Sequence, residues 1–531
     1  MTALVDRDYF SDHSILRDPY AYFEAVREKG PVYPLPGRDI VIATGFEESL
    51  EVLRNTEDFS SVIAPGGPAV PLPFEPVSDD LSAQIEEYRT AFVGGDLVVS
   101  LDGEAHGFSR SILSRLFTPS RLKANEQFIS DFADRLARDA VAKGGCELIK
   151  EIATPFVTLV IADLLGVPID DRQIFMDAIE AGPPPGSLDA EDAFSEHQPL
   201  VLMGLYFAQY VVDRRANPRD DVLSELSAST FPDGSTPDAM EIVRLATFLF
   251  GAGQDTSAKL LGNAMRFIVD RPDLQQVLRA DPSQIPGFLE EVLRLEGSTK
   301  MTARLARRDT QVAGVPIPIG TKVMIALAAA NRDPRRWEAP DEFRIGRPKI
   351  KEHLGFGRGA HVCIGAPLAR VEVQAILEKL LAYTADIDLV GEEHGERSER
   401  RLDYEPSFII RGLAKMHLKL TPAESFSPAS DAQVDAKGGR GLFGFGRKKA
   451  GAVPAVPYAT AQTKLGVLLA DPVAKALLDK HFPGVSADKR IGLGKSMTLR
   501  AIQSFAADMF TDEALDALDA ELTALGPRGG S

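Results

Sequence analysis

The chain has 531 residues, of which 44% are hydrophobic and 26% are charged, and its formal net charge is −18 at pH 7. These values are ordinary for a soluble globular protein, and the negative charge argues against nucleic acid or an anionic membrane as a main partner.

The two cysteines and the N-terminal segment indicate the cellular environment. Cys146 and Cys363 lie far apart without a framework spacing, so we expect no disulfide and a reducing compartment. The N-terminus is charged and lacks the apolar core of a signal peptide, and no apolar run approaches the ~20 residues that span a bilayer. We therefore expect a cytoplasmic protein without a membrane anchor.

The pattern of the first 420 residues predicts a mainly α fold with a small β region. A helix is expected over residues 18–28, a strand over 39–43, helices through most of 106–300, and strands at 312–317, 323–325 and 408–420. There is no βαβ alternation and no GxGxxG followed by an acidic residue, so a dinucleotide-binding fold is not indicated.

Two polar residues share one face of an early predicted helix. His106 and Arg110 are four residues apart, which places them on the same side of the helix. Alone, such a histidine is more often a structural residue than a ligand partner.

The long helical pattern from Leu245 to Leu261 contains two glycines, Gly251 and Gly253. Glycine inside a helix costs about 1 kcal/mol relative to alanine, so we expect a bend where a group presses against the helix. Asp255 and Thr256 would place an acid beside a hydroxyl at that bend. The alternative is an ordinary helix interior with a pair of cap-like residues.

A carboxylate and a guanidinium follow at helical spacing. Glu291 and Arg294 lie at i and i+3 on one helix face, a pattern that is usually a solvated surface pair. A further arginine, Arg347, occurs in the segment that leads to the second cysteine.

The segment from Phe356 to Gly365 places Cys363 in a glycine-rich loop directly before a predicted helix. The glycines allow close backbone approach, and the helix N-terminus supplies free N–H groups and a positive dipole end. Both features favour the thiolate, which is the metal-binding form of cysteine. Two alternatives are a buried structural cysteine and a zinc site with His353 and His361, although no CxxC pair completes the latter.

The amino-acid composition of the chain changes after residue 420. Residues 421–461 are rich in Gly, Ala, Pro and Ser without periodicity, so we predict a flexible linker. Residues 462–531 predict several short helices with start signals at Asp471-Pro472 and at Thr511, and with apolar residues at helical spacing from Leu515 to Leu525. This would be a small helical appendage of unknown role.

The loop around Cys363 resembles the haem-binding loop of the cytochrome P-450 monooxygenases, and the resemblance extends over about residues 10 to 420. It implies the cytochrome P-450 fold and a heme b cofactor whose iron takes the Cys363 thiolate as its axial ligand. The appendage is not part of the usual family pattern.

The resemblance also implies roles for the motifs above. Asp255 and Thr256 would form the catalytic pair that delivers protons beside the oxygen-binding groove, and Glu291, Arg294 and Arg347 would form a buried structural network. The residues implied to contact the cofactor are His106, Arg110, Ala252, Gly253, Thr256, Arg304, Phe356, Gly357, His361, Cys363 and Gly365.

The sequence says less about the substrate and the electron donor than about the cofactor. An apolar pocket with Phe248, Gly251, Ala252 and Lys300 would suit a hydrophobic small molecule, with Lys300 either pairing a substrate carboxylate or reaching solvent. No cysteine follows Cys363 and no nucleotide-binding fingerprint is present, so the resemblance implies a separate ferredoxin and an NAD(P)H-dependent reductase.

Two other functions fit part of the pattern. A haem-thiolate sensor would use the appendage as its output, but a sensor has no need of the proton relay that Thr256 suggests. A peroxide-driven enzyme would not need a ferredoxin, but family members of that kind usually replace the acid–alcohol pair.

Overall fold

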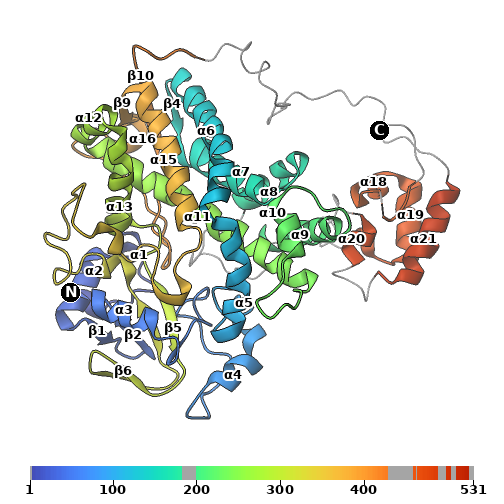
Figure 1. Cartoon of the computed structure of the whole chain (residues 1–531), viewed down its shortest axis with the longest axis horizontal. Coiled ribbons are helices and arrows are strands. Elements are labelled where there is room, and N and C mark those ends of the chain that lie inside the picture. Colours follow the sequence, from blue (N-terminus) through green and yellow to red (C-terminus); the bar gives the residue numbers. More distant parts are fainter. Residues whose placement is uncertain are drawn as a thin grey trace.

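The computed structural model describes residues 3–181, 199–428, 458–461, 463–487, 498–503 and 510–525 (Figure 1). Its helices, in chain order, are α1 (His13–Arg17), α2 (Tyr20–Lys29), α3 (Phe46–Arg54), α4 (Ser82–Glu87), α5 (Gly103–Ser114), α6 (Pro119–Ala142), α7 (Thr154–Leu164), α8 (Arg172–Ala181), α9 (Pro199–Ala216), α10 (Val222–Ala228), α11 (Ala239–Asp270), α12 (Pro272–Ala280), α13 (Ile285–Glu296), α14 (Leu327–Ala330), α15 (Ala366–Tyr383), α16 (Gly391–His394), α18 (Leu465–Ala470), α19 (Pro472–His481), α20 (Leu499–Gln503) and α21 (Asp512–Ala524).

The strands of the described residues form three small sheets. They are β1 (Val32–Pro34), β2 (Ile40–Ala43), β3 (Phe59–Ser60), β4 (Gly145–Glu147), β5 (Thr302–Ala306), β6 (Thr310–Val312), β7 (Val315–Ile317), β8 (Lys322–Ile325), β9 (Thr384–Leu389) and β10 (His417–Pro422). The five-stranded sheet has the order β1-β2-β8-β5-β3, a second sheet has the order β4-β10-β9, and β6 pairs with β7. The prediction of a mainly α fold with a small β region is therefore confirmed.

The helical core surrounds α11, which packs against α7 and α9, while α15 lies along α6 (Figure 1). Local sequence defines where these helices begin. The Asp238 carboxylate accepts the N–H of Glu241 at the start of α11, and Thr118 caps α6 just before Pro119. One continuous cluster of buried apolar side chains, from Val98 to Leu420, joins these helices to the three-stranded sheet.

Helix α11 extends beyond the helical pattern expected from Leu245 to Leu261. The structure shows one helix from Ala239 to Asp270 that continues through Gly251 and Gly253 without interruption. Neither glycine ends the helix, and buried apolar residues on both sides of this segment hold it in the core. The bend expected at these glycines stays a prediction.

The structure moves both predicted boundaries of the linker. Residues 421–428 belong to the body, since β10 reaches Pro422 and the ring of Phe426 lies 5.8 Å from that of Tyr383. At the other end, Tyr458 is buried among the apolar side chains of the appendage, and Thr460 Oγ1 donates to Asp519 at 2.6 Å. The part of the predicted linker over residues 429–457 lies outside the described residues.

The appendage has its own apolar core, made by α18, α19, α20 and α21. The side chains of Asp471 and Thr511 cap α19 and α21, as their sequence signals predict. The appendage meets the body through α20 and α9, where Leu205 packs against the appendage core (Figure 1).

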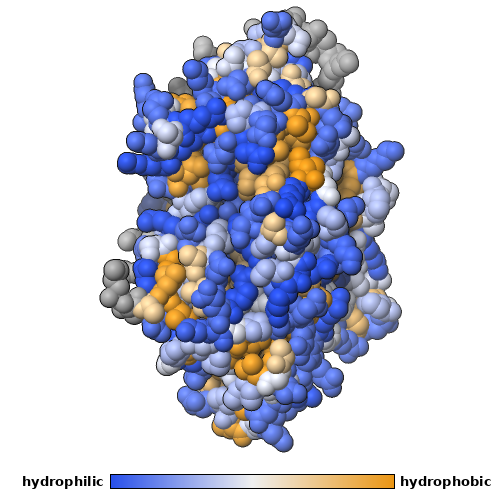
Figure 2. All heavy atoms as spheres, turned by 90° about the vertical axis from the view of Figure 1, so that its left-hand side faces the viewer, coloured by the Kyte–Doolittle hydropathy of each residue, from blue (hydrophilic) through white to orange (hydrophobic). Residues whose placement is uncertain are grey.

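The face that carries α2 and α3 is mostly hydrophilic, with separate apolar patches (Figure 2). Across the part of the chain that the structure describes, no helix combines the length and the apolar character needed to cross a bilayer.

Candidate active site

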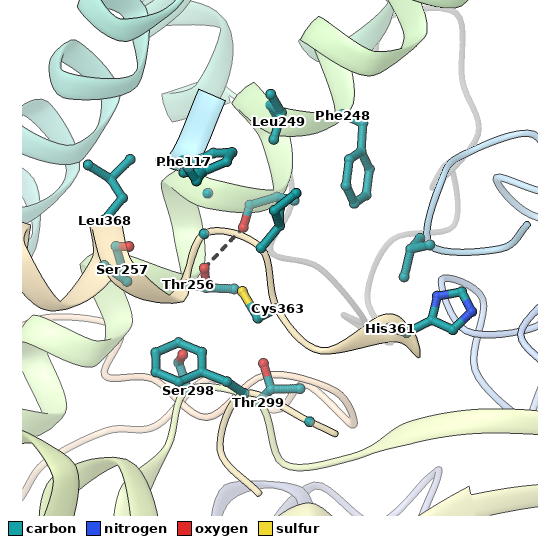
Figure 3. A pocket seen from close by; sticks show the side chains of 18 of the residues that line it. Phe117, Phe248, Leu249, Thr256, Ser257, Ser298, Thr299, His361, Cys363 and Leu368 are labelled. Carbon is teal, nitrogen blue, oxygen red and sulfur yellow. Dashed lines mark hydrogen bonds between the residues drawn. The ribbon is translucent and has the colours of Figure 1, made fainter. Parts of the chain in front are cut away.

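A cavity of about 320 Å³ lies between α5, α11, β5 and the loop that carries Cys363. Its volume falls within the range of about 300–1,000 Å³ that is usual for ligand pockets. Every predicted cofactor contact lines it, namely His106, Arg110, Ala252, Gly253, Thr256, Arg304, Phe356, Gly357, His361, Cys363 and Gly365. Figure 3 shows Thr256, His361 and Cys363 around this space.

The loop around Cys363 is fixed by backbone hydrogen bonds. The N–H of Cys363 donates to Phe356 O at 2.9 Å, and that of Gly357 donates to Leu354 O at 2.9 Å. Gly359 has φ +77°, and a Cβ atom there would lie 2.3 Å from Leu53 O, so only glycine fits against α3. The result is a sulfur held directly before the first turn of α15 and exposed to the cavity.

The electrostatics of Cys363 differ from the sequence expectation. Burial raises the pKa of the Cys363 thiol, and the N–H groups of Gly365 and Ala366 together with Arg110 only partly oppose this effect. Without a metal the thiol therefore keeps its proton, and a bound cation would release it.

Cationic and imidazole side chains gather at one end of the cavity. The rings of His106 and His361 have centroids 4.0 Å apart, and Arg110 and Arg304 line the same space. Arg304 reaches the cavity because Thr302 and Arg304 are two residues apart on β5 and therefore point to the same face of the strand. Neither arginine has an ion-pair partner among the described residues.

This end of the cavity has the character of an anion site. Burial and the neighbouring Arg304 lower the pKa of His361, and burial lowers the pKa of Arg304 to about 10. The Nε2 atom of His106 is buried without a hydrogen-bond partner among the described residues. Carboxylates of a ligand would satisfy these groups.

Helix α11 presents a stripe of residues to the cavity. Phe248, Ala252 and Thr256 follow helical spacing, and the Thr256 hydroxyl donates to Ala252 O at 3.0 Å (Figure 3). A Cβ atom at Gly253 would meet only Ile161 Cδ1, at 4.0 Å, so no protein atom fills the space beside that glycine.

Two predicted positions on α11 lie outside this stripe. Gly251, predicted in the substrate pocket, and Asp255 do not line the cavity. The stripe also includes Leu249, Gly253 and Ser257. The middle of the cavity-facing side of α11 is therefore shifted by about one residue from the side predicted from the sequence, and Gly251 and Asp255 fall beyond its edge.

Lys300 was predicted to face substrate or solvent, and both interpretations are wrong. Its side chain is fully buried and does not line the cavity. Nζ donates to Leu16 O at 2.7 Å and also to Ser407 O. Backbone carbonyls from distant segments hold the ammonium, which periodicity alone could not reveal.

The zinc alternative is also wrong. Both ring nitrogens of His353 are engaged, since Nε2 lies 3.1 Å from Glu290 Oε2 and Nδ1 accepts the N–H of Gly355 at 3.0 Å. No group of three or more potential metal ligands was found among the described residues.

The structure brings the predicted acid–arginine network together. Glu291 accepts from Arg294 Nη2 at 2.7 Å and from Arg347 Nε at 3.0 Å, and all three side chains are buried. Arg294 also donates to Asn331 O at 2.9 Å, which links α13 to the end of α14.

One buried acid was missed by the sequence analysis. Glu372 on α15 lines the cavity, and burial raises its pKa to about 8, while Ser257 on α11 hydrogen-bonds its carboxyl group. Its position between Val371 and Val373, within an apolar helix pattern, was the only signal in the sequence.

The residues present fit a heme b group. Cys363 offers a sulfur ligand, the positively charged end suits two carboxylates, and the remaining wall is mostly apolar.

Comparisons with known proteins agree with this geometry. A family model for cytochrome P450 matches residues 207–384. Cytochrome P450 144 of Mycobacterium tuberculosis (strain CDC 1551 / Oshkosh) is 32% identical over 435 residues, which cover 79% of this chain and 92% of that relative.

Solved structures are similar over the same region. Substrate-free CYP150A6 of Mycobacterium marinum shares 47% identity and a TM-score of 0.74, with 79% of this chain and 100% of that one covered. P450BioI in complex with an acyl carrier protein ligated to hexadec-9Z-enoic acid shares 26% identity and a TM-score of 0.66, with 77% and 99% covered.

Proposed function

Because the chain belongs to the cytochrome P450 family and is a haem-thiolate monooxygenase, we propose that it hydroxylates or epoxidises a hydrophobic small molecule inside the cavity beside Cys363. The observation that carries the proposal is the exposure of this sulfur to a mostly apolar cavity.

Different residues of the cavity would hold different parts of the haem. The haem, when bound, supplies the iron at which dioxygen is activated. The Cys363 thiolate would hold the iron, while His106, Arg110, Arg304 and His361 would hold the haem carboxylates. Ala252 and Gly253 would leave room between α11 and the haem.

Asp255 and Thr256 would handle protons. The Thr256 hydroxyl faces the cavity and can accept a hydrogen bond from a bound group while it donates to Ala252 O. Asp255, the preceding residue, does not line the cavity and would pass protons toward Thr256 from the protein side. This pair favours reductive activation of dioxygen over a sensor or a peroxide-driven enzyme.

Electrons would come from a separate ferredoxin and its NAD(P)H-dependent reductase. Arg358 lies in the Cys363 loop close to Arg54 of α3, and this local positive charge suits an acidic donor protein despite the net charge of −18.

We propose three parts for the chain. The body of residues 1–420 would carry the reaction and extend to residue 428, residues 429–457 would connect it to the appendage, and the appendage would start at Tyr458 and not at residue 462.

An optical titration of the ferric protein tests the proposed function. Substrates that displace water from the iron shift the Soret band to shorter wavelength. The panel would contain a fatty acid, a terpenoid, a steroid and an aromatic compound, and we expect a saturable shift with one class.

Cys363→Ser provides the control, because it should remove the thiolate signature from the haem spectrum. A spectrum unchanged by this substitution would contradict the proposed ligand. A panel without any shift would contradict a free hydrophobic substrate and favour one delivered on a carrier protein.

A further inference from the structure

A buried charge cluster at α11 includes two residues, Lys259 and Glu405, that the proposed function does not use. Lys259 lies one turn after Asp255 and is only 5% exposed. Its Nζ lies 3.9 Å from Asp255 Oδ1 and forms a closer ion pair with Glu405 Oε1. One cation is therefore shared by two carboxylates.

The chain segment that carries Glu405 is shaped to receive the lysine. Tyr404 and Leu413 form an antiparallel bridge, and the N–H of Glu405 donates to Gly412 O at 3.0 Å. We name residues 404–413 the C-terminal hairpin. A Cβ atom at Gly412 would lie 2.1 Å from Lys259 Cδ, so the absence of a side chain there lets the lysine stem pass.

A second contact fixes the same helix face to the hairpin. One turn further along α11, Asn263 Nδ2 donates to Arg411 O and to Glu296 O, both at 2.9 Å. The hairpin is thus held at two successive turns of α11, and Glu405 has a fixed position relative to Asp255.

The Asp255 carboxyl does not use all of its capacity to accept hydrogen bonds. Its distance of 3.9 Å from Lys259 Nζ is too long for a hydrogen bond. Its Oδ2 atom is buried and has no hydrogen-bond partner among the described residues. Lys259 therefore holds the Asp255 carboxyl by electrostatic attraction, and the Oδ2 atom can take up a proton.

Resting on the proposed role of Asp255 in proton delivery, we propose that Lys259 and Glu405 are positioning residues that hold the Asp255 carboxyl and set its proton occupancy. The proton supply of this enzyme would then depend on the C-terminal hairpin.

The charges determine the direction of each effect. Burial raises the pKa of Asp255 to about 6, Lys259 lowers this pKa and Glu405 raises it. Among the described residues, these two are the charged groups that act on Asp255, one from its own helix and one from the hairpin.

The test measures the Asp255 titration directly in the ferric holoenzyme. The protein would be labelled with ¹³C at aspartate carboxyl carbons, and the Asp255 resonance would be assigned by its loss in Asp255→Asn. The unmodified enzyme should give a midpoint near pH 6.

Two substitutions should move this midpoint in opposite directions. Glu405→Gln should lower it and Lys259→Met should raise it, each by about one pH unit, since a neighbouring charge shifts a pKa by about that much or more. Lys259→Arg should restore a midpoint near that of the unmodified enzyme. The pH profile of kcat with the substrate found by titration should shift in the same directions.

Lys415→Met is the matched control, because this exposed lysine pairs with Glu393 on the surface. It removes the same charge and should leave the Asp255 midpoint unchanged. Opposite shifts cannot arise from a purely structural defect, which would move both variants alike.

The outcomes separate this proposal from the function on which it rests. If neither substitution moves the midpoint while Asp255→Asn still abolishes turnover, the positioning proposal is overturned and the proposed function stands. If the midpoints shift as expected while Asp255→Asn retains full turnover, Lys259 and Glu405 do set the protonation of Asp255, but its proposed role in the reaction is wrong.

Discussion

Protonation of Glu372 should contribute to the pH dependence of stability. Its pKa is raised from 4.5 to about 8 in the folded protein, so the folded state binds the proton more tightly than the unfolded state. The contribution of the protonated acid is fully present below about pH 4.5 and is lost as pH rises toward 8.

We therefore expect Glu372→Gln to gain stability relative to the unmodified protein as pH rises from 5 to 8, by at most about 1.4 kcal/mol for each pH unit. Urea unfolding at several pH values measures this gain. Glu378→Gln on the same helix is the control at a less buried position. A pH-independent difference for Glu372→Gln would contradict the prediction.

Lys300 should matter for stability and not for substrate binding. Lys300→Met removes the donor to Leu16 O and Ser407 O and leaves buried carbonyls unpaired, at a cost of about 1–3 kcal/mol each. We expect a lower free energy of unfolding with an unchanged Soret titration, because the side chain lies outside the cavity. A weakened affinity for substrate would place Lys300 in the pocket after all.

At the scale of elements, the conformation of the Cys363 loop depends on its close contact with α3 at Gly359. Gly359 and Gly314 have nearly the same φ, +77° and +79°, but a Cβ atom at Gly314 would meet nothing within 4 Å. Alanine at either position is strained, but only at Gly359 would it also press against Leu53 O.

Gly359→Ala should therefore destabilise the protein by about 1–3 kcal/mol more than Gly314→Ala, in the range of overpacking substitutions. It should also accelerate the loss of haem to an acceptor protein, since the loop carries Cys363. Equal effects of the two substitutions would show that the contact with Leu53 relaxes without cost.

Elements were predictable where a local signal defined them. The cap residues of α19 and α21, the strand at 39–43 and the Cys363 loop all follow from neighbouring residues. The positions of Gly251 and Lys300 were not predictable, because the first depends on the rotation of α11 against the cavity and the second on carbonyls 284 and 107 residues away. Glu405 was missed for the same reason, as 146 residues separate it from Lys259.

At the scale of the whole molecule, the body and the appendage have separate apolar cores that meet at Leu205. A chain that ends at residue 428 should keep its haem spectrum. It should lose only about 1–3 kcal/mol from the exposure of one leucine side chain on α9.

Urea unfolding followed at the Soret band measures this loss. Leu205→Ser in the full chain is the companion variant, since it weakens the contact while the appendage remains. Failure of the shortened chain to take up haem would show that the appendage is required for the body to fold.

The position of the C-terminal hairpin along the chain has a consequence for biosynthesis. Arg411 N–H donates to Ser298 O at 2.7 Å, and Thr299 pairs with Ile410, so the hairpin supports two residues of the cavity wall. A nascent chain that has not reached residue 413 has α11 and the cysteine loop but lacks this support. Domains fold during synthesis from the N-terminal side. Haem capture should therefore be a late event of translation, and ribosomes stalled before residue 404 should carry chains that bind haem poorly.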